Sequence, residues 1–66
     1  MSRDYVEEVK RDIYGQLWYI AQYNENEKNI KKEARQAKKQ YAKKYSNDPD
    51  IMDAFDEVCN EMDIRI

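Results

Sequence analysis

Apolar residues that recur at steps of three and four positions constrain this chain more than any other feature of its sequence. Such spacing places side chains on one face of an α-helix, and it occurs three times. The stripes are Val6, Val9, Ile13, Leu17 and Ile20; Ile30, Ala34, Ala37, Tyr41 and Tyr45; and Ile51, Phe55, Val58 and Met62. Alternating runs of β-branched residues, which are typical of strands, are missing from the sequence. The chain is therefore predicted to be all-α.

Polar breaks divide the chain into three helices, which we expect at about residues 4–23, 27–45 and 49–63. The second break ends in Asp48 and Pro49. An aspartate at the N-cap followed by proline at the first helical position is a strong helix-start signal. The third helix is thus the one whose beginning the sequence predicts most sharply.

Short connections between three helices favour a small three-helix bundle. The 66 residues leave room for one domain, residues 1–66. Only 11 of them are Ile, Leu, Val or Phe, so the predicted core is thin. A helical hairpin completed by dimerisation is therefore the alternative architecture. We expect Ile64 and Ile66 to cover one end of the core.

Positive charge is concentrated in the middle of the chain. Residues 28–44 carry eight Lys and Arg against one Glu, a net charge of +7, whereas residues 1–27 carry −3 and residues 45–66 carry −6. Projected on a helix at about 100° per residue, most of these cations share one side. We call this side the basic face, and it consists of Lys28, Lys31, Lys32, Arg35, Lys38, Lys39 and Lys43.

Three interpretations of the basic face are open. In the first, it is a solvated face whose charge is matched by the acidic third helix. In the second, it contacts the phosphates of a nucleic acid. In the third, it attracts an acidic protein partner and steers its association. The net charge of −2 and the pI of about 5.1 weigh against nucleic acid. The carboxylates that would match the cations internally form what we call the acidic face, Asp53, Asp56, Glu57 and Glu61.

Catalytic groups are scarce. The chain has no histidine, which removes the usual general base near neutral pH and the commonest metal ligand. A single glycine excludes a glycine-rich phosphate loop. Cys59 lies on the apolar side of the third helix and is interpreted as a buried packing thiol. We therefore expect a protein that is not an enzyme and that has no cofactor and no metal site, with the acidic face simply solvated.

Aromatic residues on the first helix form the strongest candidate binding patch. Tyr19 falls on the polar side, and Trp18 lies at the margin of the apolar stripe with Tyr14 one turn before it. Tyr and Trp are enriched at interface hot spots. The alternative is that Trp18 caps the bundle. Tyr23 is expected to flank the core stripe. Gly15 projects to the polar side, so close packing does not explain it.

These features predict a non-enzymatic protein-interaction module, a small regulator or inhibitor that binds a protein partner through the aromatic patch and the charged helix faces. The alternative function is nucleic-acid binding through the basic helix, residues 28–44. A homodimer is a further option. Residues Met1–Arg11 are charged throughout, and no apolar run approaches the roughly 20 residues needed to cross a bilayer. With a single cysteine, this composition favours a cytoplasmic protein without membrane contact.

Overall fold

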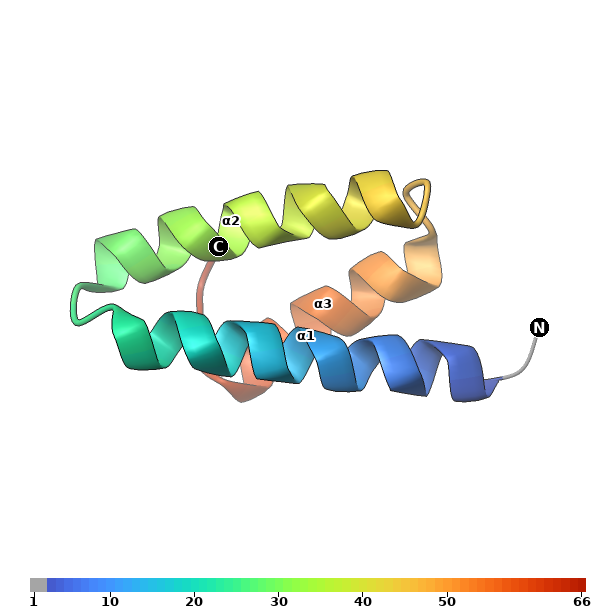
Figure 1. Cartoon of the computed structure of the whole chain (residues 1–66), viewed down its shortest axis with the longest axis horizontal. Helices are drawn as coiled ribbons and strands as arrows, with labels where there is room; N and C mark the ends of the chain where they lie inside the picture. The colour runs from blue at the N-terminus through green and yellow to red at the C-terminus, as the bar shows by residue number, and fades with distance from the viewer. Residues whose placement is uncertain (1–2) are drawn as a thin grey trace.

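The computed structural model describes residues 3–66 and contains three helices, α1 (Arg3–Tyr23), α2 (Glu27–Lys44) and α3 (Pro49–Glu61) (Figure 1). All three helices pack against one another, and α1 and α3 share the most extensive contact. This confirms the predicted all-α three-helix bundle. The hairpin alternative is not what the chain forms, because α3 covers both α1 and α2 within one chain.

Side-chain caps begin the second and third helices. The Asn26 side chain accepts a hydrogen bond of 2.8 Å from the Lys28 backbone N–H, and the Asp48 side chain accepts one of 2.9 Å from the Asp50 N–H. Pro49 occupies the first turn of α3, as the sequence predicts. Each cap satisfies one of the backbone donors that a helix N-terminus leaves without an intrahelical partner.

The core lies along one side of each helix. The largest fully buried side chains are Phe55, Ile13, Leu17, Ile51 and Val58, all of which come from α1 and α3. The α2 helix contributes only two alanines, Ala34 and Ala37, to the buried set. Each large side chain removed from water stabilises the fold by about 1.5–3 kcal/mol. The stability of this bundle therefore rests mainly on the contact between α1 and α3.

The chain folds back after α3, which ends at Glu61, two residues before the predicted end. Asp63 adopts a left-handed conformation (φ 58°). The Asp63 N–H donates a hydrogen bond to the Asn60 carbonyl oxygen, with 3.1 Å between nitrogen and oxygen. The Ile64 N–H donates one of 2.8 Å to the Cys59 carbonyl oxygen. This pair of bonds is the Schellman arrangement, which terminates a helix and turns the chain.

The fold-back covers one end of the core. The Ile64 side chain retains only 8% exposure, so it closes the core as expected. The Ile66 side chain remains 37% exposed, and its expected role in covering the core is wrong. Ile64, the residue directly after the left-handed Asp63, therefore covers this end of the core.

Candidate interaction surfaces

The solvent side of α1 carries four aromatic residues, which we call the α1 aromatic face: Tyr14, Trp18, Tyr19 and Tyr23. Trp18 is 58% exposed, Tyr19 55% and Tyr23 73%, whereas Tyr14 is 37% exposed. The core stripe of α1 uses a different side of the helix, since residues on one face recur every three or four positions. The three residues predicted as the patch therefore all reach the surface, and Trp18 does not cap the core.

Tyr23 is the residue that sequence reasoning placed wrongly. It was expected to flank the core stripe, but it is the most exposed aromatic residue of α1. Its ring lies over that of Tyr19 with centroids 4.3 Å apart. Tyrosines at positions i and i+4 on one helix are neighbours, and this spacing is the signal that would have joined Tyr23 to the patch.

Two shallow hollows flank the α1 aromatic face. One, of about 380 Å³, is lined by Tyr14, Gly15, Trp18 and Met62, where α1 meets the end of α3. The other, of about 190 Å³, lies on the opposite side of α1 against α2, and Tyr19 and Tyr23 are among the residues that line it. The aromatic residues therefore form two ridges along α1, one bordering each neighbouring helix.

Gly15 lies between these ridges on the exposed side of α1. Apart from its two sequence neighbours and the backbone of its own helix, a Cβ atom built at Gly15 would meet no atom within 4 Å, so the space above it is open. Glycine in a helix interior costs roughly 0.5–1 kcal/mol relative to alanine. No contact within the described chain offsets this cost, so the residue leaves an unfilled notch between the two aromatic ridges.

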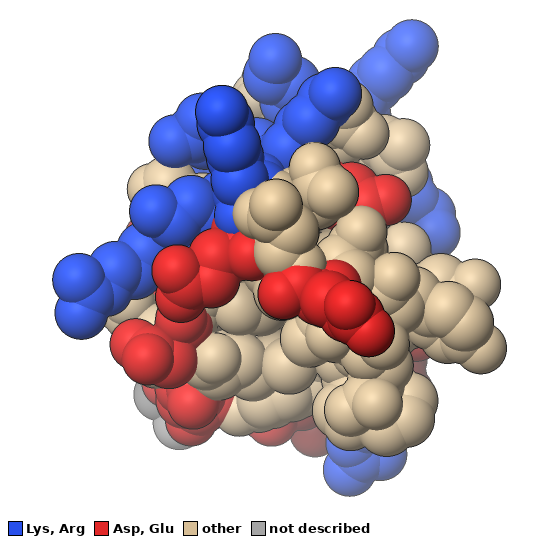
Figure 2. Space-filling model, turned by 90° about the vertical axis from the view of Figure 1, so that its left-hand side faces the viewer, with Lys and Arg blue, Asp and Glu red and all other residues tan. Residues whose placement is uncertain are grey.

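The basic face of α2 remains largely in solvent. Six of its seven cations are exposed, and only Lys38 is half-buried. Figure 2 shows Lys and Arg side chains gathered over α2 at the top of the molecule, with Asp and Glu lower on the same side. Lys38 is also the only basic-face residue with an ion pair in residues 3–66, at 2.7 Å from the carboxylate of Asp56.

The acidic face of α3 is divided between two neighbours. Asp56 points to α2, where it meets Lys38. Glu57 instead meets α1, with 3.3 Å between the Lys10 ammonium and the Glu57 carboxylate. Asp53 and Glu61 are exposed, and neither forms an ion pair within the described part of the chain. Internal charge matching between the basic and acidic faces is therefore limited to one contact.

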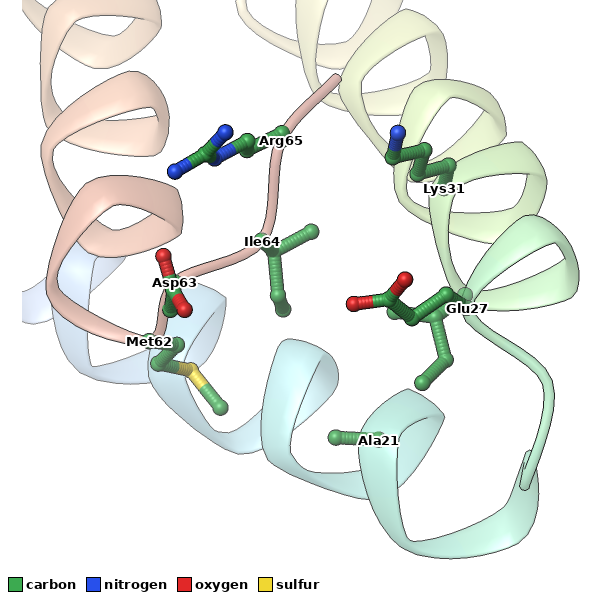
Figure 3. Close-up of a pocket in the computed structure, with 8 residues that line it drawn as sticks. Ala21, Glu27, Lys31, Met62, Asp63, Ile64 and Arg65 are labelled. Carbon is green, nitrogen blue, oxygen red and sulfur yellow. The ribbon is translucent and has the colours of Figure 1, made fainter.

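A separate pocket of about 360 Å³ lies between the N-terminal end of α2 and the C-terminal segment (Figure 3). Glu27 and Lys31 border it on the α2 side, and Asp63 and Arg65 lie across from them with Ile64 between. All four charged residues are exposed. Because two positive and two negative groups surround the opening, the pocket has no net preference for the charge of a ligand.

Cys59 is the one nucleophile in the core, and it is 2% exposed. Burial, with a smaller contribution from the Asp56 carboxylate, raises the pKa of the Cys59 thiol to about 11. Its predicted burial as a packing thiol is confirmed by that low exposure. A protonated, buried thiol is also a poor nucleophile. Within residues 3–66, no three Cys, Asp or Glu side chains are arranged to hold a metal ion.

The helices of residues 3–66 are all too short or too polar to cross a membrane. No family model, no curated protein and no solved structure matched this chain. What the molecule offers to a partner therefore has to be inferred from its surfaces alone.

Proposed function

We propose that this protein is a non-enzymatic interaction module that binds another protein through the α1 aromatic face. The observation that carries the proposal is the exposure of Trp18, Tyr19 and Tyr23, each more than half accessible to solvent. Large exposed apolar patches on small proteins mark interaction sites. Trp and Tyr also supply contact area at a low cost in conformational entropy.

The two ridges give this face a shape suited to a protein surface. Trp18 and Tyr19 project on either side of the open notch at Gly15, so a partner can insert a side chain or a helix between them. A buried aromatic anchor surrounded by polar rim residues is the usual arrangement at an interface hot spot. Arg11 and Gln22, both exposed on the same side of α1, supply polar groups beside the anchors.

The charged faces contribute to the rate and selectivity of binding. The exposed cations of α2 attract an acidic partner, and this attraction weakens as salt screens the charges. A protein that binds a partner without catalysing a reaction acts by covering part of the partner's surface, as a small regulator or inhibitor does. A reducing compartment such as the cytoplasm suits this role, because the only cysteine is a free, buried thiol.

Capture of partners on the immobilised full chain tests the proposal. We expect a Trp18→Ala, Tyr19→Ala variant to lose proteins that the unmodified chain retains from an extract of the cells that make it. Ile66→Ala is the control, because it removes an exposed large apolar side chain outside α1. Circular dichroism must show that all three proteins fold. Equal retention by the double variant would refute a binding role for the aromatic face.

A second candidate function is nucleic-acid binding through the basic face of α2. The observation that favours it is that six of the seven cations remain exposed and without an ion pair in residues 3–66. Binding would then fall steeply with salt. Replacing Lys32, Arg35 and Lys39 with Gln should weaken it for all sequences alike, whereas Arg65→Gln should not. Absence of any gel shift at about 50 mM salt would exclude this function.

A further inference from the structure

We propose that the partner of the α1 aromatic face is a second copy of this chain, bound through an antiparallel α1–α1 contact with its twofold axis at Gly15. This inference rests on the proposed protein-binding role of the face, and it names the partner. Its basis is that the two halves of the exposed side of α1 differ in chemistry, and that each half complements the other.

The first half of this side is acidic and the second half is aromatic and uncharged. Before Gly15, the exposed residues are Asp4, Glu7, Glu8 and Asp12, opposed by Arg11, together with Tyr14 directly beside Gly15. After Gly15 come Gln16, Trp18, Tyr19, Gln22 and Tyr23, none of which carries a charge. A parallel pair of α1 helices would bring the two acidic halves together. An antiparallel pair separates them, because each acidic half then lies against the uncharged half of the other copy.

A twofold axis at Gly15 brings together residues whose sequence numbers lie equally far on either side of 15. Four residues away on each side are Arg11 and Tyr19, and a guanidinium attracts the face of an aromatic ring. Three residues away are Asp12 and Trp18, whose indole N–H is a donor for the carboxylate.

The outer positions follow the same rule. Seven residues from Gly15 lie Glu8 and Gln22, and eight residues away lie Glu7 and Tyr23. In both pairs, a carboxylate faces a side chain that can donate a hydrogen bond. All the residues of these four pairs are exposed. None takes part in a hydrogen bond or ion pair within the described chain, so each group is free to meet its counterpart.

Gly15 explains why the axis lies at this position. A residue on a twofold axis meets the same residue of the other copy, which is where two identical side chains interfere most. Glycine removes this obstacle and lets the helices approach more closely than the usual separation of about 8–10 Å. The notch at Gly15 is open, and no contact from elsewhere in the described chain fills it. A self-complementary surface of this kind is what a twofold dimer requires.

Sedimentation equilibrium of the full chain gives the first test. Between about 1 µM and about 1 mM, we expect the mass to rise from 8.0 kDa towards twice that value. Gly15→Ala should weaken dimerisation at least about tenfold. The same variant should raise the thermal stability of the monomer, since alanine favours the helix. Asn60→Ala, a substitution at an exposed helix position on α3, should leave the association constant unchanged.

Oxidative cross-linking gives the second test and determines the orientation. The variants are made in a Cys59→Ala background and oxidised with copper phenanthroline. Glu8→Cys and Gln22→Cys should each cross-link poorly alone and efficiently when the two variants are mixed. Rapid self-linking of the Gln22→Cys variant would indicate a parallel pair and would overturn the antiparallel assignment.

The outcomes separate this inference from the function on which it rests. A chain that stays monomeric at about 1 mM overturns the inference. So does a dimer whose association constant is unchanged by Gly15→Ala and which the mixed Glu8→Cys and Gln22→Cys variants fail to cross-link. If the chain does not form this dimer but the Trp18→Ala, Tyr19→Ala variant still fails to retain captured proteins, the binding role of the face is kept and its partner is a different protein. If the double substitution alters neither association nor capture, the proposed function itself fails.

Discussion

The Lys38 ammonium lies 2.7 Å from the Asp56 carboxylate, and within residues 3–66 this is the single ion pair that joins the basic face to the acidic face. Both side chains are partly exposed, at 34% and 51%. The other cations of the basic face therefore gain little from α3. These cations remain exposed to solvent, so the positive charge of α2 is a property of the surface of the molecule.

The first prediction concerns the strength of this ion pair. A double-mutant cycle with Lys38→Gln and Asp56→Asn should give a coupling energy of at most about 1 kcal/mol, because solvent screens partly exposed pairs. Urea denaturation monitored by circular dichroism measures it. Lys39→Gln is the matched control, since Lys39 is exposed and has no ion pair in the described chain. A coupling above about 2 kcal/mol would mean that internal charge matching matters more than we infer.

The second prediction concerns Gly15. Gly15→Ala should increase the free energy of unfolding by about 0.5–1 kcal/mol, because the added methyl group meets open space and alanine favours the helix. In a domain of this size, the melting temperature should rise by about 4–8 °C for each kcal/mol. The measurement belongs at low micromolar concentration, where association does not contribute. Gln16→Ala should change stability much less, and a destabilised Gly15→Ala variant would contradict the open notch.

The third prediction concerns the pH dependence of stability through Cys59. The thiol has a pKa of about 11 in the folded chain against an ordinary value of 9.0. As the pH rises from 9.0 to about 11, the unfolded chain loses this proton while the folded chain keeps it. The free energy of unfolding should therefore fall across that interval and be unaffected by this group below it.

A Cys59→Ala variant should show a shallower decline over the same pH range. Burial also raises the pKa of Tyr41, so part of the decline will remain. Thiol alkylation at pH 8 provides an independent measurement. The folded chain should react far more slowly than the chain in urea, and equal rates would show that Cys59 is accessible.

The fourth prediction contrasts two large aromatic residues. Phe55 is fully buried and lies 5.8 Å from the Tyr41 ring, whereas Trp18 is 58% exposed. Phe55→Ala should cost about 3–5 kcal/mol. A chain of 66 residues has a total stability of only about 3–10 kcal/mol, so this variant should lose a large part of it. Trp18→Ala should change stability by no more than about 0.5 kcal/mol. Comparable losses for both would place Trp18 in the core.

The helices themselves could be predicted from sequence, because periodicity and cap chemistry are local properties. The stripe through Ile13 and Leu17 and the start at Asp48 and Pro49 both appear in the structure as expected. The end of α3 could not be placed as well. The reversal at Asp63 needs a left-handed conformation that aspartate adopts only occasionally.

The arrangement of the charged surfaces could not be predicted from the sequence, for a different reason. Asp56 and Glu57 are adjacent in the chain, yet they meet α2 and α1 respectively. Neighbouring residues on a helix point about 100° apart, so the orientation of α3 in the bundle determines which helix each one reaches. Periodicity gives the direction of each side chain relative to its own helix, but it does not give the crossing angles between helices.

Trp18 is the only tryptophan of the chain, and it lies on the surface. In most small domains the indole is buried and its fluorescence reports on unfolding. Here the emission of the free protein should already resemble that of indole in water, and it should shift to shorter wavelength when something covers α1. The chain thus carries a built-in optical probe of the occupancy of this surface, and binding can be followed without attaching a label.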